Sequence, residues 1–138
     1  MVTLRKALNK EMKGSETPFI IDGHYSHDLY YEKEVSCVFV LRKAPWELQK
    51  VLQERLYSSK KVWENIEAEI MGVIAEEARE NFSIEVLQEV NTTGKEEEES
   101  AVEMQNIIEG ESVSFKPIDW ITFPQTLQVL VNRTCTLS

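Results

Sequence analysis

The sequence predicts an α/β fold in which about three parallel strands are joined by helices. Two short, continuous apolar runs, Phe19–Ile21 and Ser36–Leu41, are typical of strands buried on both faces of a sheet. A third run, Ser83–Val90, is more polar and is expected at an edge or in a half-buried position. Apolar residues recur at helical spacing between the later runs, and this alternation of strand and helix favours parallel neighbours.

In the first half of the chain, a helix is expected over Val2–Met12, where apolar residues recur at every fourth position. The strand Phe19–Ile21 follows, and residues 24–35 are polar and rich in tyrosine, which predicts a loop. A second helix is expected over Pro45–Leu56, because proline suits the first helical position, where its missing N–H costs no hydrogen bond.

In the second half, Ser59 is expected to cap one long helix over Lys60–Asn81. A tight loop over Asn91–Gly94 separates the third strand from a helix over Glu96–Gly110, whose first turn is rich in glutamate and so complements the helix dipole. Near the end of the chain, Leu127–Val131 resembles a strand.

The composition limits the classes of function. The 138 residues are 42% hydrophobic, which is enough for one domain with a core. The formal net charge of -9 argues against sequence-independent binding to nucleic acid or an anionic membrane, since the field repels phosphate. No apolar run approaches the roughly 18 residues of a spanning helix, and no signal-peptide pattern opens the sequence, so a soluble, cytoplasmic protein is expected.

Asp22 and His24 directly follow the first predicted strand, where open α/β sheets place their ligands. A carboxylate there can hold a water of a bound Mg²⁺, and an imidazole two residues later can position a nucleophile or a phosphate oxygen. An ordinary turn with a capping aspartate and a surface histidine fits the pattern equally well. A third interpretation joins Asp22, His24, His27 and Asp28 in a zinc or iron site.

Charged side chains elsewhere also allow two interpretations. Arg55, Lys60 and Lys61 flank the break between two predicted helices, where they could close over phosphates or simply form a solvated corner. Lys95 could contact a ligand or neutralise the glutamates that follow it. One further set is expected to form a solvated helix face: Glu64, Glu67, Glu69, Glu76, Glu77 and Glu80.

Taken together, several segments resemble one family, the archaeal adenylate-kinase-like proteins related to eukaryotic adenylate kinase isoenzyme six. These are P-loop nucleoside monophosphate kinases. The resemblance runs from about Met1 to Trp120 and rests on segments that occur in the family's order. The segments are Ile21–His27, VLRKAP at Val40–Pro45, Arg55-x-Tyr57-Ser58, Lys61-x-x-Glu64-Asn65-x-x-Ala68-Glu69, Glu77-Ala78 and Val90–Lys95.

The resemblance implies roles for four of these residues. Asp22 would organise Mg²⁺ through water, and His24 would assist phosphoryl transfer between ATP and AMP or the hydrolysis of ATP. Arg55, in a lid over residues 54–64, would contact ATP, and Lys95 would lie near the nucleotide. Residues 1–120 would form the kinase-like domain and residues 121–138 a divergent tail. A small-subunit ribosomal protein is a further implied partner, in an alternative function as a non-catalytic binding module.

The sequence departs from the family pattern in three places. Leu56 stands where a glycine usually follows the lid arginine, and Val51 where an arginine is common. No G-x-x-G-x-G-K-[ST] phosphate loop occurs in the 138 residues. The expectation is therefore a partial, amino-terminally shortened P-loop kinase-like sheet without the phosphate-loop strand, which would be inactive by itself.

Overall fold

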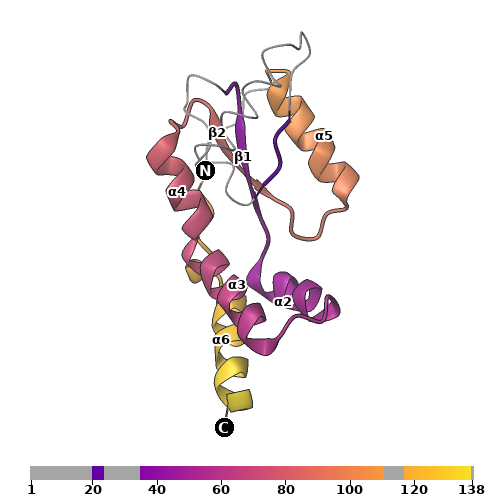
Figure 1. Cartoon of the computed structure of the whole chain (residues 1–138), viewed down its shortest axis with the longest axis vertical. Helices are drawn as coiled ribbons and strands as arrows, with labels where there is room; N and C mark the ends of the chain where they lie inside the picture. Colours follow the sequence, from indigo (N-terminus) through magenta and orange to yellow (C-terminus); the bar gives the residue numbers. More distant parts are fainter. Residues whose placement is uncertain (1–19, 24–34, 111–116, 138) are drawn as a thin grey trace, which may run out of the picture.

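The computed structural model describes residues 20–23, 35–110 and 117–137, with side chains described as far as Arg133. Figure 1 shows the two strands between helices on the left and right, with further helices below them. The elements in chain order are β1 (Val38–Arg42), α2 (Pro45–Glu54), α3 (Ser59–Met71), α4 (Val73–Asn81), β2 (Leu87–Asn91), α5 (Glu97–Ile108), a 3₁₀ turn (Trp120–Thr122) and α6 (Pro124–Leu137).

The two strands form a parallel pair, in register from Val38 opposite Leu87 to Arg42 opposite Asn91. A crossover of three helices, α2 to α4, joins them, as parallel strands require. The predicted α/β class and the strands at 36–41 and 83–90 are thus confirmed, with shifted ends. Leu87 and Val90 of β2 are buried and its other residues are partly exposed, in agreement with the half-buried position expected for this strand.

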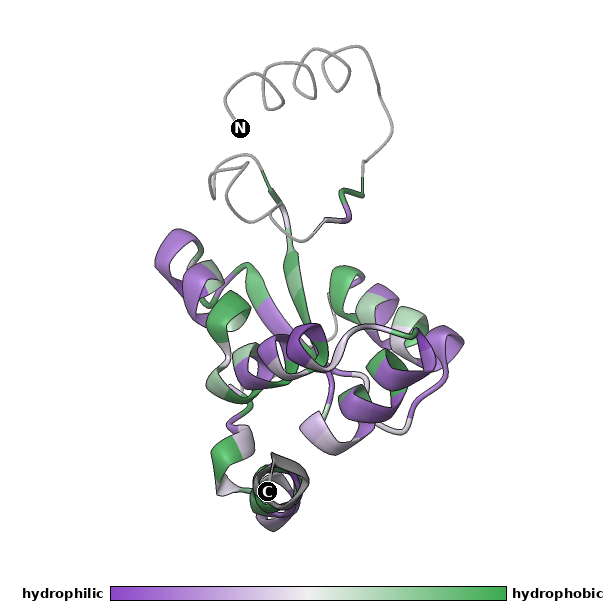
Figure 2. Cartoon of the chain, turned by 60° about the horizontal axis from the view of Figure 1, so that its bottom comes forward, coloured by the Kyte–Doolittle hydropathy of each residue, from purple (hydrophilic) through white to green (hydrophobic). Residues whose placement is uncertain are grey.

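Two apolar clusters form the core. One lies between the sheet and α4 and contains Val40, Ala75, Ala78, Phe82 and Leu87. The other lies among α2, α3 and α6 and contains Leu52, Val62, Ile66, Ile70 and Val129. Figure 2 shows helices striped with hydrophobic and hydrophilic residues, as expected for elements that bury one side only.

The predicted long helix over 60–81 is two helices, because Gly72 adopts a left-handed conformation with φ of 65°. Its N–H bonds back to the carbonyl groups of Ala68 and Glu69, which ends α3, and α4 begins at the next residue. The cap of α3 also differs from the prediction. Ser58, and not Ser59, accepts a hydrogen bond from the N–H of Lys61, at 3.3 Å.

Two strand predictions are wrong. Residues 127–131 belong to α6 and not to a strand, because Thr126 and Val129, three positions apart, are buried on one side of a helix. Ile20 and Ile21 have no strand assignment, and the side chain of Ile20 is 92% exposed. Phe19, the helix expected over residues 2–12 and the loop expected at 24–34 lie outside the described residues. The described part of the sheet therefore has two strands.

No helix in the described ranges is long and apolar enough to cross a membrane.

Replacing Gly72 by alanine is predicted to destabilise the protein by about 1–2 kcal/mol, since the left-handed conformation places Cβ against the following carbonyl. Space does not oppose the substitution: the nearest atom to an added Cβ is an Arg42 guanidinium nitrogen at 3.6 Å. The measurement is urea unfolding of the two proteins. A Gly110→Ala variant, also at positive φ but with no atom within 4 Å, is the control for strain without a neighbour. Equal stability of the Gly72→Ala variant and the parent would contradict the prediction.

Candidate functional site

The carboxyl ends of β1 and β2 lie side by side, the position where parallel sheets bind ligands. The loop after β2 is fastened there to the start of α2. The backbone N–H and the hydroxyl of Thr92 both donate to the carbonyl of Arg42, at 2.8 and 2.9 Å. The N–H of Ala44 donates to the Thr93 hydroxyl at 2.8 Å, and that of Gly94 to the Glu47 carboxylate at 2.9 and 3.1 Å. The loop therefore has a fixed position relative to α2.

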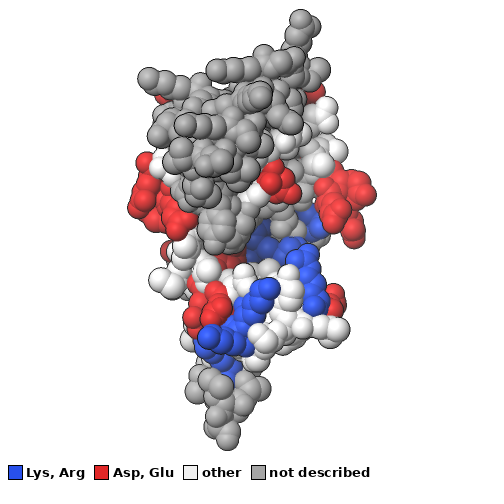
Figure 3. All heavy atoms as spheres, in the orientation of Figure 1, with Lys and Arg blue, Asp and Glu red and all other residues white. Residues whose placement is uncertain are grey.

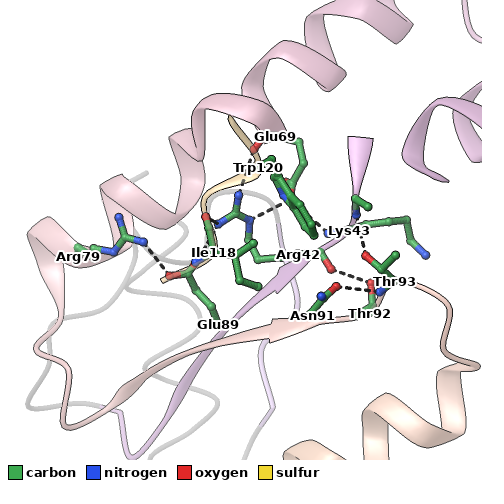
Figure 4. Close-up of polar contacts among 11 residues, drawn as sticks. Arg42, Lys43, Glu69, Arg79, Glu89, Asn91, Thr92, Thr93, Ile118 and Trp120 are labelled. Carbon is green, nitrogen blue, oxygen red and sulfur yellow. Dashed lines mark hydrogen bonds and ion pairs between the residues drawn. The ribbon is translucent and has the colours of Figure 1, made fainter. Parts of the chain in front are cut away.

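Arg42, the last residue of β1, is buried beneath this edge, and its guanidinium lies at the centre of Figure 4. Its Nε donates to Glu69 Oε1 of α3 at 2.8 Å, and a terminal nitrogen pairs with the fully buried Glu89 of β2. The same nitrogen donates to the carbonyl of Ile118 at 3.0 Å, and the other to the carbonyl of Glu69 at 3.0 Å. One side chain thus connects both strands, α3 and the segment before α6.

Glu69 is a second centre of this network. Besides the Arg42 guanidinium, its Oε1 accepts the backbone N–H of Lys43 at 3.2 Å and the indole N–H of Trp120 at 2.9 Å. Trp120 is 1% exposed and lies 5.9 Å from the Arg42 guanidinium, ring centroid to carbon. The prediction that Glu69 belongs to a solvated helix face is wrong, because its carboxylate is shared by three donors.

The second oxygen of Glu89 is bound by Arg79 of α4 at 2.7 Å, and Arg79 also bonds Glu76 at 2.6 Å. Burial lowers the pKa of Arg79, but the hydrogen bond and charge of Glu89, followed by those of Glu76, outweigh it and raise the pKa above its usual value. Two guanidinium groups therefore balance two carboxylates: the buried Arg42 and Glu89 are joined by the partly exposed Arg79 and Glu69.

The corner between α2 and α3 is the part predicted to be a lid. Arg55 and Ser58 are exposed there, and Figure 3 shows Lys and Arg side chains concentrated over the part of this face where Figure 1 draws α2 and α3. The ammonium of Lys61 lies 4.1 Å from the centroid of the Tyr57 ring. An open pocket of about 340 Å³ adjoins the corner, lined by Gln53, Leu56, Tyr57, Ser59, Val62 and Trp63.

Leu56 has a φ of 58°, which a glycine adopts without strain and other residues rarely adopt, and its side chain is 90% exposed. The corner thus keeps the backbone conformation of a glycine at the position where the sequence has leucine.

The predicted site residues lie at separate places. Asp22 is exposed in the described segment 20–23, and His24 lies outside the described residues, as do His27 and Asp28. Lys95 follows the loop at the sheet edge and pairs with Glu103 of α5 at 2.8 Å. This pair agrees with the interpretation in which Lys95 neutralises glutamates that follow it. Within the described ranges, no hydrogen bond or ion pair joins Asp22, Arg55 and Lys95.

The described residues give little support for a metal site or for a reactive cysteine. They contain no cluster of three or more His, Cys, Asp or Glu side chains suited to a metal ion. Desolvation by burial raises the pKa of the Cys37 thiol above its usual value and outweighs the lowering effect of a hydrogen bond with the Val38 backbone. The Cys37 thiol is therefore protonated at neutral pH and is not an activated nucleophile.

Comparison with known proteins agrees with the resemblance of the segments. No protein-family model matches the chain. A "Putative adenylate kinase" of Methanosarcina barkeri is 38% identical over 131 residues, which cover 88% of this chain and 68% of that protein. The chain belongs to this adenylate kinase family.

Two further relatives of the adenylate kinase family match a smaller share of their own length. A "Putative adenylate kinase" of Thermococcus kodakarensis is 41% identical over 105 residues, 76% of this chain and 55% of that protein. An "Adenylate kinase isoenzyme 6 homolog" of Caenorhabditis elegans is 34% identical over 96 residues, 70% of this chain and 52% of that protein. The chain spans little more than half the length of these two curated relatives.

Sequence reasoning missed the Arg42 network of this family member. The signal available was an arginine directly after an apolar strand, in VLRKAP, together with a glutamate inside the polar strand β2. An ionisable residue in a buried strand needs a partner of opposite charge, and that requirement could have linked Arg42 to Glu89.

The substitution Arg42→Met is predicted to destabilise the protein by about 3–5 kcal/mol, because it leaves the buried Glu89 carboxylate and the partly buried Glu69 carboxylate without their shared cation. Arg55→Met, at an exposed position, is the matched control and should change stability by less than about 0.5 kcal/mol. Chemical unfolding of both variants measures the difference. The network would be unimportant for stability if the two variants unfolded at the same denaturant concentration.

The substitution Leu56→Gly is predicted to leave stability unchanged or to raise it by up to about 1 kcal/mol, because relief of the left-handed conformation offsets the chain entropy of glycine. Leu56→Ala keeps the unfavourable φ and is the control. Thermal unfolding should therefore rank the glycine variant above the alanine variant. The reverse order would show that the leucine side chain, rather than the backbone, determines stability at the corner.

Proposed function

We propose that this chain is the lid-bearing part of an adenylate-kinase-type phosphotransferase, which binds ATP with Mg²⁺ and moves phosphate between ATP and AMP or hydrolyses ATP. The observation that carries the proposal is the family membership established by the relative of which the chain covers 68%. The position of Arg55 adds to it. That arginine has no ion-pair partner among the described residues, and it lies at the far end of a helix that begins beside the sheet edge.

Phosphoryl transfer needs positioning and charge neutralisation more than covalent chemistry. A guanidinium can donate two parallel hydrogen bonds to phosphate oxygens, which makes Arg55 the residue of this chain best suited to hold the phosphates of ATP. Lys95 follows a loop that is hydrogen-bonded to β1 and α2, so its backbone position near the nucleotide would be stable. Its pair with Glu103 would have to open for direct contact with a phosphate.

The proposed magnesium ion fits the chemistry of Asp22, an exposed carboxylate, since Mg²⁺ usually keeps several waters and binds through one or two carboxylates plus substrate phosphates. A bound Mg²⁺ would neutralise phosphate charge. His24 would assist the transfer or the hydrolysis. Cytoplasmic location stays a prediction from the sequence pattern, and a non-catalytic role in contact with a small-subunit ribosomal protein stays a prediction from the resemblance.

Binding of a fluorescent ATP analogue with Mg²⁺ tests the role of Arg55. Arg55→Ala should weaken binding by about tenfold or more, because a charge-assisted hydrogen bond contributes roughly 1.5–3 kcal/mol. Lys50→Ala removes another exposed cation of the same helix and should change binding little. Equal losses in the two variants would indicate unspecific attraction to positive charge, and an unchanged affinity of the Arg55→Ala protein would exclude the proposed contact.

Formation of ADP from ATP, AMP and Mg²⁺ tests catalysis. The purified 138-residue chain is expected to show no robust turnover, since its sequence contains no glycine-rich phosphate loop with its lysine. Robust turnover would overturn this expectation and would show that other groups cradle the phosphates. A pull-down from cell extract that recovers small-subunit ribosomal proteins would instead favour the binding-module role.

A further inference from the structure

The segment after Pro117 is anchored beside the sheet before it becomes a helix. The carbonyl of Ile118 accepts a hydrogen bond from Arg42, and the N–H of Ile118 donates to Glu89 at 3.4 Å. The Trp120 ring packs edge-on against Trp46 of α2, with centroids 5.6 Å apart, while its N–H binds Glu69. The Thr126 hydroxyl donates to the carbonyl of Trp120 at 2.6 Å, which joins the 3₁₀ turn to the first turn of α6.

From this anchor, α6 extends along α2 and α3, the two helices that meet at the corner. In Figure 1 it lies beside α3. Val129 of α6 is 5% exposed and belongs to the apolar cluster that contains Leu52 of α2 and Ile66 of α3. One turn later, Arg133 pairs with Glu67 of α3 and lies 4.8 Å from the centroid of the Trp63 ring. Helix α6 therefore contacts α2 and α3, the two helices that meet at the corner, while the segment before it contacts the sheet.

The corner itself has few contacts of its own. Residues 53–56 and 58–61 are exposed, and Tyr57 is the least exposed residue between the two helices. Segments with few buried apolar contacts open at low free energy, whereas segments held by a core open only with that core. The cluster that contains Val129 also contains Leu52 of α2 and Val62 of α3, and Tyr57 of the corner packs against it.

We propose that α6 is a strap that restrains the α2–α3 corner, so that opening of the corner is coupled to release of α6 from the cluster around Val129. The anchor at Trp120 stays in place during this movement, because it belongs to the buried Arg42 network. The coupling is a property of the fold and holds independently of the proposed function. If Arg55 does contact phosphate, α6 controls how far it can move.

Hydrogen–deuterium exchange of the full 138-residue chain tests the strap. In a Val129→Ala variant, amides of the corner and of α6 should exchange about tenfold faster, because removal of buried methyl groups weakens the docking of α6. Amides of β1 and β2 should exchange at the parent rate. Val131→Ala is the matched control, the same substitution two residues later at a position that is 46% exposed, and it should leave all rates unchanged.

A second, milder substitution distinguishes a local effect from global unfolding. Val129→Thr keeps the shape of the side chain, and within a helix its hydroxyl can bond a carbonyl of the preceding turn, so it should accelerate exchange at the corner by a smaller factor than Val129→Ala. Faster exchange in α6 with an unchanged corner would overturn the proposal, since α6 would then dock without restraining anything. Equal acceleration of the corner and the strands in both Val129 variants would also overturn it, because the effect would be general destabilisation.

Discussion

The ion pairs and hydrogen bonds of Arg42 join both strands, α3 and the segment before α6. A guanidinium with only 2% of its side chain exposed has lost its hydration, and this cost is offset only if carboxylates and carbonyl groups surround it. The carboxylates of Glu69 and Glu89 and the backbone carbonyls of Glu69 and Ile118 do so, and they belong to three different parts of the chain: α3, β2 and the segment before α6. The geometry of the guanidinium therefore sets how the strands, α3 and the segment before α6 can be arranged.

The local elements of this fold could largely be predicted from sequence, because apolar period and length carry that information. The strand around Val40 and the helix that begins at Pro45 follow directly from such patterns. The break at Gly72 could not, since a glycine inside a helical pattern is compatible with both a continuous and an interrupted helix. The run around Val129 was misjudged because a short apolar run fits a strand as well as a helix.

The candidate site shows the same division. Arg55 and Lys95 could be predicted as candidates because short motifs mark them, but the carboxylate partners of Arg42 lie 27 and 47 residues away in sequence and no local pattern connects them. Pairing across such distances is decided by the crossover that brings β1, α3 and β2 together. The resemblance to the family implies roles for the motif residues, which stay proposals, and the structure shows the contacts that hold the segments carrying Arg55 and Lys95.

The left-handed residue at Gly72 has a wider consequence, because it stands between two separate apolar clusters. The cluster of Phe82 and Leu87 lies on the α4 side of Gly72, and the cluster of Ile66 and Leu52 lies on the α3 side. Each cluster can keep its own packing while the backbone at one residue changes direction, so the chain can behave as two cooperative units. The hydrogen bonds and ion pairs of Arg42 connect these units. The strength of a hydrogen bond depends on orientation more strictly than that of an apolar contact. A small rotation at Gly72 would therefore change the hydrogen-bond geometry of Arg42 before either cluster loses a contact.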